Sequence, residues 1–216
     1  MLELRASKIG GCVRQYVMLL RSGEEPELTV RQKLYFAVGK RLEPVIAEHA
    51  GYPLNILFND SCKVEIPINN DILLTGHPDG EFQNWVIECK TMRSFAYRKA
   101  RDRGLDVQFP QYLVQVSVYV KGLNAQGVIF LCLDKDASEI TELRFRSEEL
   151  EPYWQKAVAN AEKIARWVGK TRLPGREKGL PKWACSLAYC PLTSCRYHFA
   201  HPANIKSKRF RQSGKP

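Results

Sequence analysis

The chain has 216 residues, of which 44% are hydrophobic, and carries a formal net charge of +10 at pH 7. This length allows one domain with a sizeable core, or one domain with a small appendage. Its longest apolar runs, such as residues 128–133, are too short to cross a bilayer, which excludes a membrane-spanning protein. The charge favours a polyanionic partner, although nucleic acid, ribosomes and membrane surfaces would all explain it.

Helices are predicted first along the chain. Ser7 is a suitable N-cap for a helix that runs to about Leu20, and Gly23 is a suitable stop. A second helix is predicted from Thr29 to Ala50, because apolar residues recur there with a helical period and form one buried stripe. The members of this stripe are Leu34, Val38, Leu42, Val45 and Ile46.

The rest of the chain alternates between strand-like and helical patterns. Strands are expected at residues 54–58, 62–66, 72–75, 85–89, 126–133 and 139–145. Further helices are expected after residue 93, from Pro110, which suits a first helical turn, and from Ser147, which is a plausible cap. This mixture predicts an α/β fold with a central mixed sheet flanked by helices, followed by a cysteine-bearing tail.

Two carboxylates and one lysine lie within twelve residues: Asp79 in Gly-His-Pro-Asp-Gly, and Glu88 and Lys90 in Val-Ile-Glu-Cys-Lys. A glycine-bounded, polar break separates the apolar runs on either side, so we expect a hairpin with Asp79 at the end of its first strand. Side chains alternate along a strand, so Glu88 and Lys90 should share one face and Cys89 should lie on the other. Two close carboxylates become favourable when a hard divalent cation bridges them. A solvated strand with a chance Glu-x-Lys triplet is the alternative.

Together these segments resemble the PD-(D/E)XK nucleases, and within them the RecB-like and lambda-exonuclease-like groups. The resemblance implies a restriction-endonuclease-like core in which Asp79 and Glu88 hold Mg²⁺ or Mn²⁺ and the backbone carbonyl of Cys89 is a further ligand. It also implies that Lys90 is the catalytic lysine that positions the attacking water. The implied partner is DNA with free ends or single-stranded character.

A motif on the second predicted helix is similar to the first motif of the same family. Gly39 and Glu43 form a Gly-x-x-x-Glu, which implies Glu43 as a third acidic ligand of the metal. A solvated glutamate is the alternative, and Pro44 would kink or restart the helix. His49 and His77 are alternative ligands, although His77 fits better as a residue that shapes the turn or contacts phosphate.

The helix predicted from Pro110 carries a polar and aromatic stripe. Gln111, Gln115 and Tyr119 fall on one face of this largely apolar helix. Such a stripe requires a buried polar partner or a substrate. Gln115 and Tyr119 resemble the Gln-x-x-x-Tyr motif of RecB-like nucleases, which implies that they brace Lys90 and the DNA strand in the catalytic site. A core role is the alternative for Tyr119.

A basic segment follows the lysine motif directly. Its cations alternate with Phe95 and Tyr97, so they could grip phosphates while the rings stack on bases. A solvated amphipathic helix is the alternative. The cations expected to contact DNA are Arg93, Arg98, Lys99, Arg101 and Arg103.

Seven cysteines form two groups. Cys62, Cys89 and Cys132 lie singly in apolar runs and are expected to be buried thiols. Disulfides are least expected, because the number is odd and no signal sequence is recognised. One N-terminal cysteine with a C-terminal trio resembles the iron-sulfur subset of RecB-like nucleases, which includes the AddB nuclease domain and the nucleases of CRISPR adaptation. The resemblance implies a 4Fe-4S cluster on Cys12, Cys185, Cys190 and Cys195. Zinc is the alternative, since structural zinc sites also use four thiolates, and His198 and His201 widen the choice of ligands.

These features predict four segments: an N-terminal helix in residues 1–28, a nuclease core in 29–170, a cluster-binding segment in 171–205 that packs back on the N-terminus, and a basic tail in 206–216. The expected function is a cytoplasmic, Mg²⁺- or Mn²⁺-dependent DNA exonuclease with possible helicase, integrase or recombination partners, acting in repair, recombination, phage replication or CRISPR adaptation. One alternative is a noncatalytic DNA-binding or assembly protein with a structural cluster or zinc site. Another is an endonuclease on the same fold.

Overall fold

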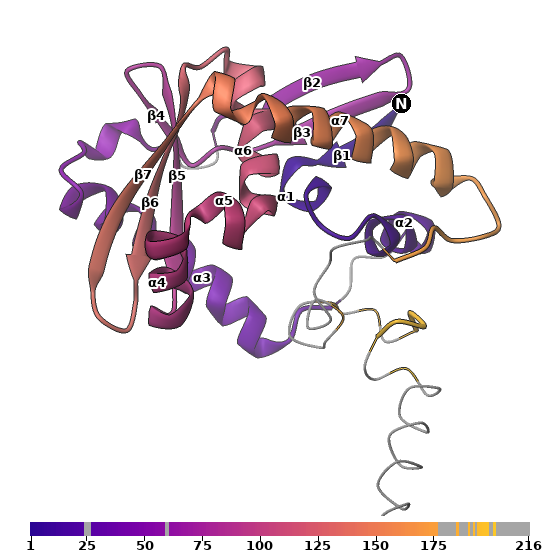
Figure 1. The fold of residues 1–216 in the computed structure, drawn as a ribbon, viewed down its shortest axis with the longest axis horizontal. Coiled ribbons are helices and arrows are strands. Elements are labelled where there is room, and N and C mark those ends of the chain that lie inside the picture. The colour runs from indigo at the N-terminus through magenta and orange to yellow at the C-terminus, as the bar shows by residue number, and fades with distance from the viewer. Residues whose placement is uncertain are drawn as a thin grey trace, which may run out of the picture. The chain divides into compact units, whose positions relative to one another are not determined.

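The structure is a computed structural model that describes residues 1–23, 27–58, 61–176, 185, 190, 192, 194–198 and 201. The chain forms two compact units (Figure 1). The first contains Met1–Gly10 and Leu28–Ala165, and the second contains Gly11–Glu27 and Arg166–Pro216. Every strand found among the described residues belongs to the first unit. The predicted basic tail, residues 206–216, lies outside the described residues.

A three-stranded mixed sheet forms one part of the first unit. Its strand order is β1-β3-β2, with β1 parallel and β2 antiparallel to the central β3. The strands are β1 (Leu2–Arg5), β2 (Val64–Asn69) and β3 (Ile72–Gly76). The strands predicted near residues 62–66 and 72–75 are therefore confirmed, whereas β1 lies in a segment for which the sequence predicted no strand.

A four-stranded mixed sheet forms the other part, with the order β4-β5-β6-β7. The two central strands are parallel, and each edge strand is antiparallel to its neighbour. The strands are β4 (Gly80–Phe82), β5 (Trp85–Met92), β6 (Gly127–Asp134) and β7 (Glu139–Arg146). Nearly every residue of β6 is buried, as expected for a strand covered on both faces. The predicted α/β fold with mixed sheet flanked by helices is confirmed, with the strands divided between two sheets.

The predicted hairpin between residues 71–75 and 84–87 is wrong. β3 and β5 belong to different sheets, and the hairpin partner of β5 is the three-residue strand β4. Gln83 and Asn84 join them, with φ angles of 50° and 63°. Two consecutive residues with positive φ are what a type I′ turn requires, and its twist matches that of the flanking strands. A strand as short as β4 has too few residues to show an alternating pattern, which is why periodicity did not reveal it.

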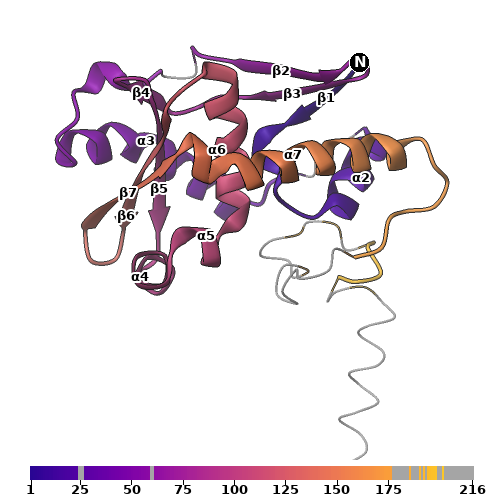
Figure 2. The ribbon, with the colours of Figure 1, turned by 45° about the horizontal axis from the view of Figure 1, so that its top comes forward.

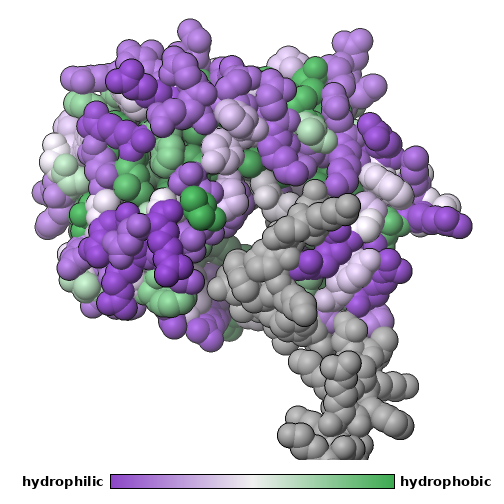
Figure 3. All heavy atoms as spheres, viewed as in Figure 1, coloured by the Kyte–Doolittle hydropathy of each residue, from purple (hydrophilic) through white to green (hydrophobic). Residues whose placement is uncertain are grey.

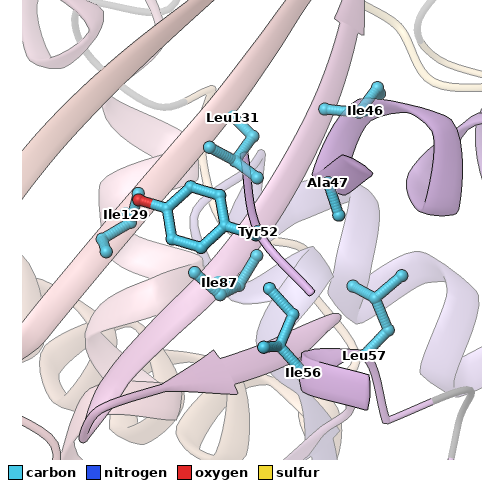
Figure 4. Close-up of a cluster of buried hydrophobic side chains, with 8 residues drawn as sticks. All are labelled: Ile46, Ala47, Tyr52, Ile56, Leu57, Ile87, Ile129 and Leu131. Carbon is cyan, nitrogen blue, oxygen red and sulfur yellow. The ribbon is translucent and has the colours of Figure 1, made fainter. Parts of the chain in front are cut away.

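Helix α3 (Val30–His49) packs against β5 and β6. Thr29 caps it: the Thr29 hydroxyl accepts a hydrogen bond from the backbone nitrogen of Gln32, and the Gln32 side chain accepts one from Thr29 N. Figure 4 shows the hydrophobic cluster that α3 shares with the sheet. Its buried members are Ile46, Ala47, Tyr52, Ile56, Leu57, Ile87, Ile129 and Leu131. Each fully buried large side chain contributes roughly 1.5–3 kcal/mol, so this cluster fixes α3 on the sheet.

The remaining helices of the first unit include α6, which begins at Pro110 as predicted and also contacts β5. Figure 2 gives a second view of the arrangement of these helices. On the face seen in Figure 3, hydrophobic side chains are interspersed with hydrophilic ones. These helices are α1 (Ala6–Ile9), α4 (Ser94–Arg103), α5 (Leu105–Gln108), α6 (Pro110–Leu123) and most of α7 (Ser147–Val168).

Three sequence predictions of local structure are wrong. The first predicted helix is interrupted at residues 10–12, so α1 and α2 (Val13–Ser22) are separate, although Gly23 does end α2 with a φ of 66°. Residues 54–56 form a 3₁₀ turn instead of a strand. The stripe on α3 is only partly buried: Ile46 is fully buried, but Leu34, Val38 and Val45 are exposed. The helical period was right, but contacts with the sheet decide which face is covered.

The second unit contains α2 and the described residues of the C-terminal part. Arg21 of α2 donates hydrogen bonds to the backbone carbonyls of Val168, at 3.1 Å, and Arg172, at 2.8 Å. One side chain thereby connects segments about 150 residues apart in the sequence. Within the described part of the chain, no helix has the length and apolar character needed to cross a membrane.

Candidate active site

Asp79 lies in the connection between β3 and β4, beside the middle of β5. Its Oδ2 accepts a hydrogen bond from the backbone nitrogen of Cys89 at 2.8 Å. Its backbone carbonyl accepts one from Phe58 N at 3.0 Å. The bond from Cys89 N fixes the carboxylate of Asp79 beside the Glu-Cys-Lys motif, a position that the expected hairpin does not supply. The bond from Phe58 N holds the backbone of Asp79.

Glu88 and Lys90 lie on the same face of β5, as the alternation predicted, and their side chains form an ion pair. Glu88 is 2% exposed, and its Oε1 also accepts a hydrogen bond from Gln115 Nε2 at 3.1 Å. Its second oxygen, Oε2, is buried and has no hydrogen-bond partner among the described residues. A buried carboxylate oxygen without a partner is costly. This orphaned oxygen fits a divalent metal, for which carboxylate oxygen is a preferred ligand.

The protonation of the site follows from its burial and its charges. Burial raises the pKa of Glu88 to about 7; the Lys90 ammonium opposes this shift, while the charges of Asp79 and Glu43 add to it. Burial lowers the pKa of Lys90, but the negative charges of Glu88 and Asp79 outweigh that effect and raise it above its ordinary value. Lys90 is therefore a cation at neutral pH, suited to stabilise negative charge and unsuited to accept a proton.

Glu43 reaches this neighbourhood from α3. Its negative charge contributes to the raised pKa of Glu88. Its Oε2 forms an ion pair with Lys40 Nζ at 3.0 Å. Within the described ranges, no three His, Cys, Asp or Glu side chains are arranged as a metal site. His49, the alternative ligand, is exposed, and its Nδ1 lies 3.0 Å from the carbonyl of Val45 on its own helix. His77 is also exposed.

The Gln-x-x-x-Tyr pair lies on the face of α6 turned toward β5. Gln115 Nε2 donates to Glu88 Oε1 and to Tyr119 Oη, the latter at 2.9 Å. Tyr119 is 2% exposed, and burial, with the charge of Glu88, raises its pKa. The resemblance implied that this pair braces Lys90, whereas Gln115 contacts Glu88, the ion-pair partner of Lys90.

Tyr112 is a residue that the sequence analysis missed. The Nζ atom of Lys90 lies 4.9 Å from the centre of the Tyr112 ring, and the ring is stacked on Phe109 at 5.4 Å. A cation over an aromatic face is attracted by the ring quadrupole. Tyr112 lies three residues before Gln115 and seven before Tyr119, so it is on the same side of α6. The four-residue spacing of Gln111, Gln115 and Tyr119 passed over it.

The basic segment forms α4 and the residue before it. Tyr97 is 2% exposed and its hydroxyl lies 2.5 Å from Thr141 Oγ1, so this ring is not available for stacking on a base. Phe95 is 68% exposed, with Lys99 Nζ 4.3 Å from its ring centre. Arg101 forms ion pairs with acids, which reduces the positive charge that it offers to a ligand; these acids are Asp102 and Glu139.

The second unit brings together the four cysteines named above. They line one pocket, together with His198 and Arg14. Burial raises the pKa of the Cys12 thiol, and the neighbouring thiols Cys185 and Cys195 add to the increase. Arg14 Nε donates a hydrogen bond to Cys195 Sγ at 3.4 Å. Four thiols around one pocket fit a thiolate-bound iron-sulfur cluster or zinc in the chemistry of their donor atoms, although among the described residues they do not have the arrangement of metal ligands.

His198 has a different role from the cysteines in this pocket. It is fully buried, and its Nε2 lies 2.9 Å from the backbone carbonyl of Cys190. A ring nitrogen engaged with a carbonyl holds the backbone of the cysteine segment. His201, the other alternative, is partly exposed.

Comparison with known proteins gives a match in fold. No protein-family model matches the chain, and no curated protein matches it in sequence. The crystal structure of SSO0001 superposes with a TM-score of 0.55 and 19% identity, covering 90% of this chain and 85% of that one. The complex of LHK-Exo with dAMP superposes with a TM-score of 0.50 and 14% identity, covering 76% and 88%. LHK-Exo is an alkaline exonuclease from Laribacter hongkongensis.

These neighbours identify the class of fold. The chain shares its fold with SSO0001 and LHK-Exo, so the expected α/β architecture with mixed sheet flanked by helices is confirmed. At identities below 20% this likeness concerns the fold, and the chemistry has to be argued from the side chains of the site.

Proposed function

We propose that the protein is a metal-dependent deoxyribonuclease that hydrolyses phosphodiester bonds at DNA ends. The observation that carries the proposal is the buried carboxylate of Glu88. One of its oxygens is bound by Lys90 and Gln115, and the other has no partner among the described residues. A divalent cation would satisfy this oxygen and relieve the repulsion from Asp79. The fold shared with LHK-Exo supports the same conclusion.

In this proposal the residues of the site have three roles: metal ligand, cation at the reacting phosphate, and support for a ligand. Asp79, Glu88 and the backbone carbonyl of Cys89 would hold Mg²⁺ or Mn²⁺, with Glu43 as a further ligand. When bound, such an ion lowers the pKa of a coordinated water and neutralises charge on the phosphate. Lys90, kept protonated by its acidic neighbours, orients the water and stabilises the developing negative charge. Gln115 holds the Glu88 carboxylate in place, and Tyr119 accepts the second hydrogen bond of that amide.

Digestion of end-labelled linear DNA tests this proposal. Linear DNA is compared with circular single-stranded and circular duplex DNA, in Mg²⁺ and in Mn²⁺, with Lys90→Ala in parallel. An exonuclease at this site degrades only the linear DNA, and the variant loses at least a hundredfold in rate, because preorganised charge contributes about 3 kcal/mol. Cleavage of circular DNA would indicate an endonuclease. Failure to cleave any substrate in the presence of metal would support a noncatalytic DNA-binding protein.

We further propose that the second unit holds a structural 4Fe-4S cluster on Cys12, Cys185, Cys190 and Cys195. The four thiols lining one pocket, with Cys190 and Cys195 each 8% exposed, support this assignment. Anaerobically purified protein should contain about four irons and four sulfides per chain, and each Cys→Ala variant should lose them. One zinc per chain without sulfide would replace the cluster by a zinc site.

A further inference from the structure

A group of cationic side chains surrounds one exposed tyrosine on the N-terminal half of α3. Tyr35 is 43% exposed, and its hydroxyl accepts a hydrogen bond from Arg31 Nε at 3.0 Å. The guanidinium carbon of Arg31 lies 5.4 Å from the ring centre, and Lys135 Nζ lies 4.8 Å from it. The hydrogen bond from Arg31, with the charges of Arg31 and Arg93, lowers the pKa of Tyr35. Arg31 from α3 and Lys135 from the β6–β7 turn therefore lie at one ring, and Arg93, the residue after β5, is near enough for its charge to act on the ring hydroxyl. We call this group the Tyr35 cluster.

The charge of the Tyr35 cluster is not neutralised within the described residues. No ion pair there joins Arg31, Arg93 or Lys135 to an acid. The carboxylates of Asp134 and Asp136, on either side of Lys135, keep their charges but are held at the start of α4. Asp134 accepts a hydrogen bond from Ser94 Oγ, and Asp136 accepts one from Ser94 N. Like charges held together repel each other, and an anionic ligand relieves this repulsion. The cluster therefore has the charge of a site for phosphate groups.

The Tyr35 cluster lies close to the candidate active site, because α3 carries both Tyr35 and Glu43. Eight helical residues correspond to about 12 Å along the axis and about 80° around it, so both side chains leave the same side of the helix. Between them, a Cβ built on Gly39 would lie 3.9 Å from Oγ1 of Thr91, the residue after Lys90. This part of α3 therefore runs along the end of β5 that carries the catalytic lysine. A stacked single strand covers twelve ångströms with about three or four nucleotides, and an extended strand covers it with fewer.

We propose that the Tyr35 cluster binds single-stranded nucleic acid, with the tyrosine ring stacked on a base and Arg31, Arg93 and Lys135 at the adjacent phosphates. Exposed rings beside cations are the usual means of binding a single strand without sequence preference. A duplex keeps its base faces stacked inside, so it cannot use the ring. The inference rests on the proposed function for the identity of the polymer as DNA, and it adds that the strand is unpaired a few nucleotides from the scissile bond.

Binding to a noncleaving protein tests the proposal. In a Lys90→Ala background, fluorescence anisotropy with a 12-nucleotide oligothymidine at fixed salt should show that Tyr35→Ala weakens binding about tenfold. Tyr35→Phe, which keeps the ring, should stay within threefold. Phe36→Ala is the matched control, because Phe36 is the next residue and is 64% exposed. It should change binding less than twofold, and a 12-base-pair duplex should be bound equally by all variants.

Salt dependence gives a second measurement that does not depend on the ring. The double variant Arg31→Gln, Lys135→Gln should reduce the slope of log K against log salt for the oligonucleotide by about 1.4, or 0.7 per lost phosphate contact. Unchanged affinity of Tyr35→Ala, an equal loss in Phe36→Ala, or an unchanged salt slope would overturn the proposal. Since binding requires no cleavage, these results are independent of whether the parent protein is a nuclease.

Discussion

Gln115, on α6, donates a hydrogen bond to Oε1 of Glu88, on β5, over 3.1 Å. The same amide donates to Tyr119 Oη, one turn further along α6. Gln115 therefore connects α6 to the Glu88 carboxylate on β5, and Tyr119 in turn holds the Gln115 amide in place. A metal ligand that is oriented in this way by a second residue loses less conformational entropy on binding.

Replacing Gln115 should reduce catalysis without unfolding the protein. Gln115→Ala removes a hydrogen bond to a carboxylate, which is worth about 1.5–3 kcal/mol. The expected loss in kcat is about 10- to 100-fold, with a weaker apparent affinity for Mg²⁺, measured on a linear duplex over a metal titration. Gln111→Ala, one turn earlier on the same helix, is the control and should keep its activity. Full activity of Gln115→Ala would contradict the role assigned to this amide.

Metal binding should depend on pH through Glu88. Because the pKa of this carboxyl is raised to about 7, a proton competes with the metal below that value. The affinity for Mn²⁺ should therefore increase by up to about tenfold per pH unit from pH 5.5 to 7 and then level off, as measured by calorimetry without DNA. Glu88→Gln should bind weakly at every pH. A flat profile for the parent protein would exclude Glu88 as the titrating ligand.

The stability of the metal-free protein should decrease as the pH rises, whereas the metal affinity increases. An acid whose pKa is raised from 4.5 in the unfolded chain to about 7 in the folded one keeps its proton up to a higher pH when folded. The folded state then binds more protons between these values, so stability falls as the pH rises through this window. Thermal unfolding in EDTA should show a lower midpoint at pH 7.5 than at pH 5, and excess Mn²⁺ should remove most of the difference. An equal midpoint at both pH values would contradict the burial of an ionisable Glu88.

Gly76 should be intolerant of a side chain. A Cβ built there would lie 2.4 Å from Cε1 of Tyr119 and 3.1 Å from Cβ of Ala6. Gly76→Ala should therefore displace the Tyr119 ring and lower the free energy of unfolding by about 1–3 kcal/mol, as overpacking does. Denaturant unfolding and DNA digestion measure the two effects. Gly169→Ala, where no atom lies within 4 Å of the added carbon, should leave both unchanged.

Arg14 should support the cysteine site. Besides its bond to Cys195 Sγ, Arg14 donates to the carbonyl of Pro174 at 2.6 Å and lies over the Tyr197 ring. Arg14→Met should lower the iron or zinc content per chain, because one sulfur and one backbone segment lose their partner. Arg21→Met is the matched control from the same helix, since the Arg21 bonds given above go to backbone carbonyls. Equal metal content in the Arg14 variant and the parent would contradict this role.

Much of the site could be predicted from the sequence because its pattern is local. The alternation of Glu88, Cys89 and Lys90 in β5 and the spacing of Gln115 and Tyr119 on α6 follow from strand and helix periods alone. The Tyr35 cluster could not be found in this way, because its residues come from α3, the end of β5 and the β6–β7 turn. The same holds for the contact between Lys90 and Tyr112.

The sequence by itself determined the span of α3, the starts of α6 and α7, the common face of Glu88 and Lys90, and the residue types available for a divalent metal and for a thiolate-bound group. Only the tertiary structure decided that β3 and β5 lie in different sheets, that β4 forms the hairpin, and that Leu34 and Val38 on α3 are exposed. The physical reason is the range of the interactions. Periodicity records the backbone geometry of neighbouring residues, whereas strand pairing and helix packing depend on which distant segments bury the most surface together.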